Sequence, residues 1–380
     1  MRIVFTGGGT GGHFYPIIAI SEAIERMAEE KHLIEPELFY IGPAPFDPAA
    51  LAEHDIEYRS SPAGKMRRHG SMLNPIELVK IAVGVVKSIF QLFSIYPDVV
   101  FSTGGYAAFP TLFAARILAI PVVIYDADAE PGRVTRWSAS FARWIGVAHP
   151  DAAAKLPEAH RAKIATLGHP IREEIRMPAK EGGHEYLKLN PDLPTILVMG
   201  GSQGAQALNN VILDALKDLT ERYNVIHQTG AANLEEVRGI AREILHDGPG
   251  ADRYRPFGLL NTLALRMAAG ISSLIVARAG SGTIFEVAAW NIPAILVPIP
   301  LDVSHDQTEN AFSYMRRGAC LVVEQKNLTP HVLSAEIDRL MGSEPMRQKM
   351  IEAAKKFAQQ DAARKIAVIL LETGLEHEPK

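Results

Sequence analysis

Two segments of this sequence share one plan: an apolar run of strand character, a cluster of glycines and then an amphipathic helix. The first reads RIVFTGGGTGGH from Arg2, and the second reads TILVMGGSQGA from Thr195. A glycine turn at a helix start leaves free N–H groups and the positive end of the helix dipole open to an anion. The repeat therefore predicts two similar α/β domains, each with a glycine turn at the carboxyl end of its first strand.

The sequence around both turns alternates between short apolar runs and amphipathic stretches, which indicates parallel sheets covered by helices on both faces. Strands are predicted at 37–41, 98–102, 121–126, 144–149 and 163–168, helices at 75–95, 106–118 and across 328–373, and further α/β alternation through 223–229, 273–282 and 294–300. We expect domains at 1–172 and 173–357, with a C-terminal helix at about 358–376 that packs back on the first. The polar stretch 173–194 is interpreted as a linker.

The composition is that of a globular protein. A chain of 380 residues is too long for one compact core, and its formal net charge of −4 gives no general attraction to nucleic acid. The lone cysteine, Cys320, excludes an internal disulfide framework. No secretion signal is evident before the first strand. Lys80 and Lys87 interrupt the most apolar segment, 77–93, so we expect no membrane crossing.

The first glycine turn formally matches the dinucleotide-binding fingerprint at Gly7, Gly9 and Gly12. That fingerprint also needs an acidic residue at the end of the second strand to bind a ribose, and this strand ends in YIGP at 40–43. An NAD-dependent dehydrogenase is therefore disfavoured. The sequence has no Gly-Lys-Ser/Thr, which excludes P-loop NTPases, and a plain strand-to-helix turn is the remaining alternative.

Five motifs lie in order along both halves: GGTGGH at 8–13, GGY at 104–106 with Pro110 four residues later, GHPIR at 168–172, GGSQGA at 200–205 and RAGSGTIFE at 278–286. Together they resemble the MurG family, the bacterial N-acetylglucosaminyltransferases of peptidoglycan lipid synthesis. The resemblance implies a GT-B fold, two Rossmann-like domains facing across a cleft, with no metal or other cofactor. It implies inverting transfer of N-acetylglucosamine from UDP-GlcNAc to the C4 hydroxyl of N-acetylmuramic acid in lipid I, which gives lipid II.

By this resemblance the second domain binds the nucleotide sugar. Helix starts and a cation can neutralise the diphosphate of the leaving UDP without a metal. A glutamate one turn beyond Thr283 suits two ribose hydroxyls, and side-chain amides suit hexose hydroxyls because they both donate and accept. For Phe257 the alternative is an ordinary core phenylalanine, and for the polar cluster before Gln307 and Asn310 the alternative is helix capping. The expected donor-binding residues are Arg172, Gly201, Ser202, Gln203, Phe257, Ser281, Thr283, Glu286, Gln307 and Asn310.

The resemblance also implies that the first glycine turn faces the diphosphate of the acceptor. The attacking hydroxyl loses a proton, and an imidazole titrates near neutral pH, so His13 is the predicted general base. Asp128 is the alternative base. The expected acceptor-binding residues are Thr10, Gly11, Gly12, His13, Gly105 and Tyr106.

One loop departs from the family pattern HEQN-A-x-PG, because this chain has YDADAEPG at 125–132; His169 likewise replaces an asparagine. The departure leaves open a related lipid glycosyltransferase that uses another UDP-sugar or a diacylglycerol-type acceptor. A nucleotide-sugar-binding protein without turnover is a further alternative. Asp126 and Asp128 also fit a DxD metal motif, which the tandem architecture disfavours.

A basic and apolar segment between Ser61 and Phe90 is the candidate membrane contact. Its single acid, Glu77, is outnumbered by Lys65, Arg67, Arg68, Lys80 and Lys87, and apolar side chains lie between them at Met66, Met72, Leu73, Ile76, Val79 and Val83. Such a surface suits anionic headgroups and a polyprenyl-linked acceptor. A sheet-covering helix with solvated lysines is the alternative. We expect a cytoplasmic protein bound peripherally to the inner face of the cell membrane.

Overall fold

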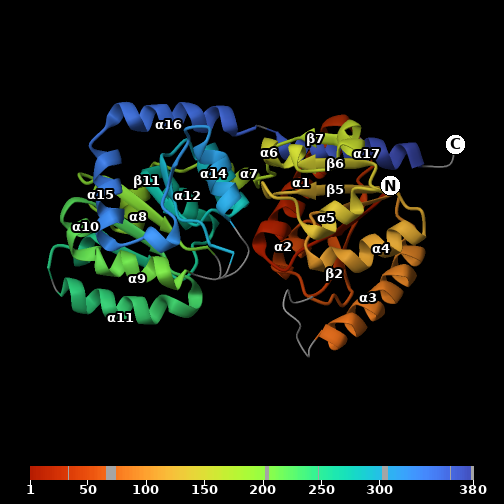
Figure 1. Ribbon diagram of the computed structural model, residues 1–380, viewed down its shortest axis with the longest axis horizontal. Helices are drawn as coiled ribbons and strands as arrows, with labels where there is room; N and C mark the ends of the chain where they lie inside the picture. The colour runs from red at the N-terminus through yellow and green to blue at the C-terminus, as the bar shows by residue number, and fades with distance from the viewer. Residues whose placement is uncertain are drawn as a thin grey trace. The chain divides into compact units, whose positions relative to one another are not determined.

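The computed structural model divides into two compact units, residues 1–172 with the C-terminal residues from Gln359 (unit 1) and residues 173–358 (unit 2). The structure describes residues 1–32, 34–65, 74–201, 205–246, 248–301, 307–359 and 361–377. Each unit is built on its own parallel sheet with helices packed around it (Figure 1). The predicted α/β class with two Rossmann-like domains is confirmed.

The described part of unit 1 contains a seven-stranded sheet in the order β3-β2-β1-β4-β5-β6-β7, with every neighbouring pair parallel. The strands are β1 (Arg2–Thr6), β2 (Glu37–Gly42), β3 (Ile56–Ser60), β4 (Val99–Ser102), β5 (Val122–Asp126), β6 (Trp144–Val147) and β7 (Ile164–Thr166). The helices are α1 (Gly11–Lys31), α2 (Pro48–Glu53), α3 (Asn74–Ile95), α4 (Phe109–Ile117), α5 (Arg133–Ser138), α6 (Pro150–Ala154) and α17 (Ala362–His377), with short 3₁₀ turns at Tyr106–Ala108 and Glu158–Lys163. Helix α17 packs on α1.

The described part of unit 2 repeats this plan with six parallel strands in the order β10-β9-β8-β11-β12-β13. The strands are β8 (Thr195–Met199), β9 (Asn224–Gln228), β10 (Tyr254–Phe257), β11 (Ser272–Ala277), β12 (Ala294–Leu296) and β13 (Leu321–Val322). The helices are α7 (Glu173–Arg176), α8 (Gly183–Leu187), α9 (Gln206–Asp214), α10 (Leu216–Arg222), α11 (Leu234–Leu245), α12 (Thr262–Ile271), α13 (Ser281–Trp290), α14 (Thr308–Met315), α15 (Pro330–Met341) and α16 (Glu344–Phe357). Short 3₁₀ turns lie at Ala231–Asn233, Ala251–Arg253 and Gln325–Asn327.

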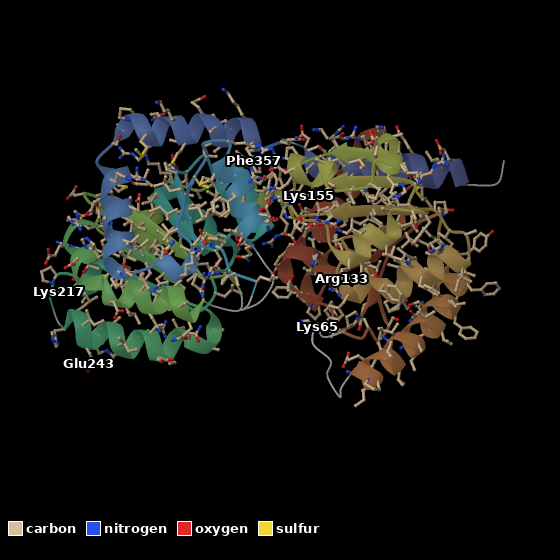
Figure 2. All side chains as sticks on the ribbon, viewed as in Figure 1. Lys65, Arg133, Lys155, Lys217, Glu243 and Phe357 are labelled. Carbon is tan, nitrogen blue, oxygen red and sulfur yellow. The ribbon has the colours of Figure 1, made fainter. Side chains whose placement is uncertain are left out.

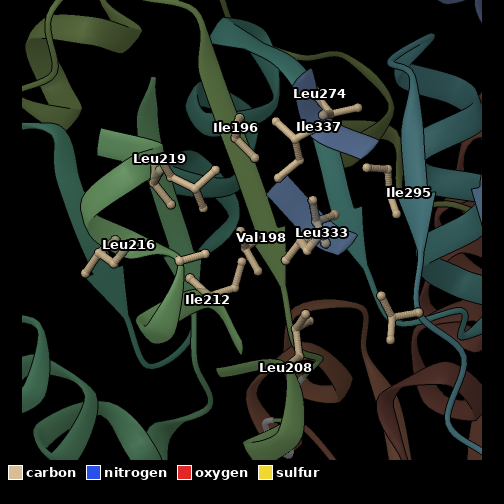
Figure 3. Close-up of a cluster of buried hydrophobic side chains, with 14 of the residues drawn as sticks. Ile196, Val198, Leu208, Ile212, Leu216, Leu219, Leu274, Ile295, Leu333 and Ile337 are labelled. Carbon is tan, nitrogen blue, oxygen red and sulfur yellow. The ribbon is translucent and has the colours of Figure 1, made fainter. Parts of the chain in front are cut away.

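One hydrophobic cluster of unit 2 lies between its sheet and helices that include α9 and α15. Ile196 and Val198 of β8 project toward Leu208 and Ile212 of α9 and toward Leu333 of α15 (Figure 3), and all five side chains are fully buried. Burying aliphatic side chains of this size stabilises a fold by roughly 1.5–3 kcal/mol each. The glycine turn after β8 is therefore held at the edge of a rigid, well-packed layer.

In each sheet the winding direction reverses at one place, next to the first strand. The reversal lies between β1 and β4 in unit 1 and between β8 and β11 in unit 2. Loops that leave the carboxyl ends of two such strands run to opposite faces of the sheet, and the crevice between them is where ligands bind in open α/β sheets. Both glycine turns of the sequence lie at these two points.

The stretch 173–194 is an integral part of unit 2, so its interpretation as a linker was wrong. It contains α7 and α8, and its apolar residues Ile175 and Leu187 are 1% and 3% exposed. The indole Nε1 of Trp290 donates to the Ile175 carbonyl at 2.7 Å. Its polar composition concealed a few anchoring apolar residues, because a short amphipathic helix needs only one buried side chain per turn.

Helix α3 carries an exposed apolar face. Within the described residues, Pro75–Ile95 is the helix long and apolar enough to cross a membrane by length and composition, with a mean hydropathy of 1.8 in a window that is 22% buried. Gly84, Ser88, Leu92 and Ile95 form its buried side and follow one another at helical spacing. The outward-facing apolar side chains are Ile76, Leu78, Val79, Val83, Val86, Phe90 and Phe93.

Candidate active site

The glycine loop of unit 1 is shaped by contacts with its two neighbouring strands. Gly7 has φ +150°, and a Cβ atom on it would lie 2.0 Å from Oγ1 of Thr103, which directly follows β4. Only glycine fits that approach and that backbone conformation. The Thr103 hydroxyl donates to the His13 carbonyl at 2.8 Å, and the buried Tyr40 hydroxyl donates to the Gly7 carbonyl. The loop is therefore fixed in shape.

The imidazole of His13 lies at the reversal point of unit 1, where it connects the loop after β1 to the loop after β4. Its Nδ1 lies 2.9 Å from the Thr103 carbonyl oxygen. A carbonyl can only accept a hydrogen bond, so Nδ1 carries the hydrogen and Nε2 of the neutral ring holds a lone pair. A Cβ atom on Gly105 would lie 3.5 Å from Nε2, so the glycine leaves room beside that nitrogen. This is the geometry of a base that is oriented by its second nitrogen.

The other residues expected at the acceptor gather around this loop. Thr10 precedes α1 and its side chain makes no capping hydrogen bond, which leaves the first-turn N–H groups of Gly11 and Gly12 without a side-chain cap. Tyr106 lies against the loop, with its ring 3.1 Å from where a Cβ atom on Gly9 would lie. Lys65, labelled in Figure 2, places Nζ 5.9 Å from the Tyr106 ring centroid.

The departing loop at 125–132 is organised by its first aspartate. The buried Asp126 carboxylate accepts hydrogen bonds from the backbone N–H groups of Asp128 at 3.1 Å and Gly132 at 2.9 Å. Burial, followed by the charge of Asp128, raises the pKa of Asp126. Asp126 thus holds the loop in shape, and the half-buried Asp128 is presented from it. No group of three or more His, Cys, Asp or Glu side chains suited to a metal ion occurs among the described residues.

Two of the positions at which the sequence departs from the family pattern, Tyr125 and His169, contact each other. The Tyr125 hydroxyl donates to the Gly168 carbonyl at 2.9 Å and lies 3.0 Å from Nδ1 of His169. Burial, with a smaller contribution from His149, lowers the pKa of His169 to about 3, so this ring is neutral at physiological pH. The pair ties the GHPIR segment to the end of β5.

The structure places the predicted phosphate ligand Arg172 in unit 1. Its guanidinium carbon lies 4.2 Å from the ring centroid of Tyr15, a residue of α1 two positions after His13. Sequence reasoning missed Tyr15 and Thr103. Thr103 carried a usable signal, because it connects β4 to the glycines of GGY, whereas Tyr15 reads as an ordinary helix residue.

In unit 2 the described donor residues lie at a strand end, on loops and on the helices α13 and α14, after the carboxyl ends of the strands. Gly200 N–H donates to the Gln228 carbonyl at 3.1 Å, and Gly201 adopts φ +84°. Ser202 and Gln203 lie outside the described residues. Phe257 ends β10 and is half-buried, with its carbonyl accepting from Thr229 N–H at 2.8 Å.

The start of α13 is fixed by the two amides that the sequence assigned to the sugar. Gln307 Oε1 accepts from the backbone N–H groups of Ala279 at 3.1 Å and Ile299 at 3.2 Å. Asn310, 2% exposed, donates from Nδ2 to the Ala279 carbonyl at 3.4 Å. Their first observed role is therefore to hold the turn before α13. For Gln307 the oxygen is already engaged, which leaves Nε2 as the group that can contact a ligand.

The α13 start presents the remaining donor residues on one short helix. Ser281 and Thr283 lie in its first turn, after an N-cap at Gly280 that has no side-chain bond, and Glu286 lies one turn further. Positions three apart lie on the same helix face, so Thr283 and Glu286 are neighbours. The arrangement can offer backbone N–H groups to phosphate and a carboxylate to a diol.

The fold of two parallel-sheet α/β units is that of the GT-B glycosyltransferases. The family models of the glycosyltransferase family 28 N-terminal and C-terminal domains match residues 3–147 and 195–366. The chain is 35% identical to a Treponema denticola protein over 87% of this chain and 85% of that one, and 33% identical to a Legionella pneumophila protein over 100% and 98%. Both relatives are described as UDP-N-acetylglucosamine–N-acetylmuramyl-(pentapeptide) pyrophosphoryl-undecaprenol N-acetylglucosamine transferases. The chain belongs to this family, the MurG family, so the resemblance is confirmed.

Solved structures agree with this fold. The Acinetobacter baumannii MurG crystal structure superposes with a TM-score of 0.72 at 24% identity and covers 98% of this chain and 99% of that one. A Staphylococcus aureus MnaA structure with UDP also reaches a TM-score of 0.72, at 16% identity over 99% of this chain and 98% of that one. At these identities the likeness describes the fold alone.

Proposed function

We propose that this enzyme transfers N-acetylglucosamine from UDP-GlcNAc to the C4 hydroxyl of N-acetylmuramic acid in undecaprenyl-pyrophosphoryl-MurNAc-pentapeptide, with inversion. The observation that carries the catalytic part is the orientation of His13 by the Thr103 carbonyl, 2.9 Å from Nδ1. Nε2 takes the proton of the acceptor hydroxyl as its oxygen attacks the anomeric carbon. The bond from that carbon to the UDP oxygen breaks, and its electron pair leaves with UDP.

Unit 1 is the proposed acceptor site. Its anion-binding elements are the first-turn N–H groups of α1, which have no side-chain cap, and the N–H groups of the loop that Thr103 and Tyr40 hold open. Helix starts of this kind favour phosphate because donors and dipole act together. Gly105 and Tyr106 complete the wall of the loop beside His13.

Unit 2 is the proposed donor site. The helix start at Ser281 faces no acid in its first turn, and Glu286 follows on the same face. We assign the diphosphate to the N–H groups at the starts of α9 and α13, and the ribose diol to the Glu286 carboxylate. Arg172 supplies the cation that offsets charge on the leaving diphosphate.

Helix α3 is the proposed membrane contact, on the inner face of the cell membrane. One side is tied into unit 1, because the Ser61 hydroxyl donates to the Gly84 carbonyl at 3.1 Å and lies 2.9 Å from the Ser88 hydroxyl. The opposite side exposes apolar groups such as Phe90 and Phe93, at 70% and 73%, with Lys80 and Lys87 beside them. A helix docked along one side suits a position in the interface plane rather than a span. Of the predicted patch, residues 66–73 lie outside the described residues.

The membrane assignment is tested by flotation with vesicles of anionic or zwitterionic lipid. Phe90→Ser combined with Phe93→Ser is expected to reduce binding to anionic vesicles by about 30-fold or more, because each buried ring contributes on the order of 1–2 kcal/mol. Ile240→Ser, at an exposed apolar position of α11, is the matched control. Equal binding of both variants would exclude α3 as the contact.

The reaction is tested by UDP release from the purified protein. UDP-GlcNAc with the lipid-linked MurNAc acceptor is expected to give acceptor-dependent UDP and a disaccharide-lipid product, whereas UDP-glucose, UDP-galactose and diacylglycerol are expected to give little. Preferred use of another sugar or of diacylglycerol would support the related lipid glycosyltransferase. Donor binding without acceptor-dependent release would leave a binding protein.

A further inference from the structure

Arg172 is held by an aromatic ring of the acceptor helix, and we propose that Tyr15 is a positioning residue that presents the Arg172 guanidinium to the diphosphate of the nucleotide sugar. The guanidinium carbon lies 4.2 Å from the Tyr15 ring centroid. Both residues belong to unit 1. The role rests on the proposed function, since it assigns a task to Arg172 in that reaction.

The Tyr15 ring is itself fixed before it meets the arginine. Its centroid lies 5.7 Å from that of Phe46 in an edge-on contact, and its hydroxyl lies 3.4 Å from Oδ2 of Asp47. A Cβ atom on Gly11, one helical turn earlier, would lie 3.3 Å from the Tyr15 ring. A ring braced by the helix backbone, Phe46 and Asp47 offers a stationary surface.

A stationary surface matters for an arginine because of its flexibility. The arginine side chain carries about 2 kcal/mol of rotamer entropy, which is lost when it binds a phosphate. Stacking on an aromatic ring is worth roughly 0.5–2 kcal/mol and restricts the same rotations in advance. The aromatic face forms no conventional hydrogen bond, so the guanidinium N–H groups stacked on it can still donate to phosphate oxygens.

The placement also ties Arg172 to the helix that carries His13. Tyr15 lies two residues after the proposed base and one turn after Gly11, so the ring that carries Arg172 moves with the helix that begins at the acceptor loop. A cation fixed to that helix is held in register with His13. Tyr15 therefore fixes the position of the Arg172 guanidinium within unit 1.

A double-mutant cycle tests the proposal. Tyr15→Leu is expected to lower kcat/KM for UDP-GlcNAc about fivefold, the range of a partly desolvated cation–π contact. Tyr15→Phe, which keeps the ring, is expected to stay within about twofold of the wild type. In an Arg172→Met background Tyr15→Leu is expected to have almost no further effect, because its partner is gone. Phe113→Leu, which removes a ring from the separate aromatic contact with Trp137, is expected to act equally in both backgrounds.

A second readout is independent of turnover. The Arg172 Nε–H resonance, assigned by its loss in Arg172→Met, is expected at ring-shifted values in the wild type and Tyr15→Phe, and unshifted in Tyr15→Leu. Absence of the ring-current shift in the wild type and in Tyr15→Phe would overturn the stacking of Arg172 on Tyr15, whatever the activity. An intact shift with no acceptor-dependent UDP release would instead overturn the proposed function. Equal losses for Tyr15→Leu in both backgrounds, or a gain in donor affinity, would overturn the positioning role.

Discussion

The two units share one topology but differ in the chemistry at their reversal points. In unit 1 this point holds ionisable and aromatic groups, with His13 bonded to the Thr103 carbonyl and Arg172 stacked on Tyr15. In unit 2 the turn before α13 is held by the side-chain amides of Gln307 and Asn310, bonded to the backbone of Ala279, and by the buried Arg278, which donates to the Val297 carbonyl. The comparison teaches that topology determines where a ligand binds, whereas side chains determine whether that place can move a proton.

The same contrast extends to the buried histidines. His169 of unit 1 bonds Tyr125 beside the acceptor loop, whereas His227 of unit 2 lies within its sheet between the Tyr254 hydroxyl at 2.8 Å and Asn209 Oδ1 at 3.0 Å. Burial lowers the pKa of both rings to about 3. His227 therefore serves as a neutral hydrogen-bonding group inside unit 2, whereas His13 is partly exposed.

The largest effect is expected when the residue assigned to proton transfer in unit 1 is replaced. His13→Ala is expected to lower kcat by about 10² or more while the affinity for UDP-GlcNAc stays nearly unchanged, because the donor is assigned to the other unit. His13→Asn is the control, since its amide can still donate toward Thr103 but has no basic lone pair. It should lose as much activity as alanine. Steady-state kinetics and calorimetry of donor binding provide the two measurements.

Unchanged turnover in both His13 variants would move the base to Asp128. Asp128→Asn would then be expected to abolish activity. This outcome would also mean that the departing loop, which Asp126 shapes through the N–H groups of Asp128 and Gly132, supplies the chemistry.

A smaller effect is expected on the binding side. Glu286→Gln is expected to raise KM for UDP-GlcNAc about tenfold with little change in kcat, because a charged acceptor for the ribose hydroxyls is worth about 1.5–3 kcal/mol. Glu236→Gln on the exposed face of α11 is the matched control. A fall in kcat at unchanged KM would contradict the assignment of Glu286 to ground-state binding.

The buried histidines predict how stability depends on pH. Because their folded pKa values lie near 3, below the unfolded value of 6.5, the unfolded chain binds more protons between these limits. Their stabilising contribution is full above pH 6.5 and declines as pH falls toward 3, by at most about 1.4 kcal/mol per pH unit for each ring. The free energy of unfolding, measured by urea denaturation between pH 7 and 5, should depend on pH with a shallower slope in His227→Gln than in the wild type. His331→Gln, at an exposed site on α15, should keep the wild-type slope.

The smallest expected effect is that of a chelator. Excess EDTA is expected to leave acceptor-dependent UDP release within experimental scatter, because helix starts and Arg172 are proposed to neutralise the leaving diphosphate. Restoration of a lost activity by Mg²⁺ or Mn²⁺ would favour the DxD interpretation of Asp126 and Asp128. Asp126→Asn would then reduce activity through metal affinity rather than through loop shape.

Several elements were readable from the sequence because their signals are local. The strands β4, β5 and β8 are buried along their length, β1 and β11 are buried after their first residues, and the helix predicted from 75 to 95 is found at Asn74–Ile95. Strand β3 escaped prediction because four of its five residues are exposed, so no apolar run marks it. The polar stretch 173–194 misled for the opposite reason, since its few buried residues are separated by charged ones.

The sequence by itself determined the repeated strand–glycine–helix plan, and with it two parallel sheets and the loops on which ligands bind. These follow from hydrophobic periodicity and from glycine at turns, which act within a few residues. Tertiary structure alone decided that His13 meets Thr103, that Tyr125 meets His169 and that Arg172 meets Tyr15, pairs separated by 90, 44 and more than 100 positions. Such contacts depend on how the sheets order their strands, and strand order leaves no mark on the local pattern of residues.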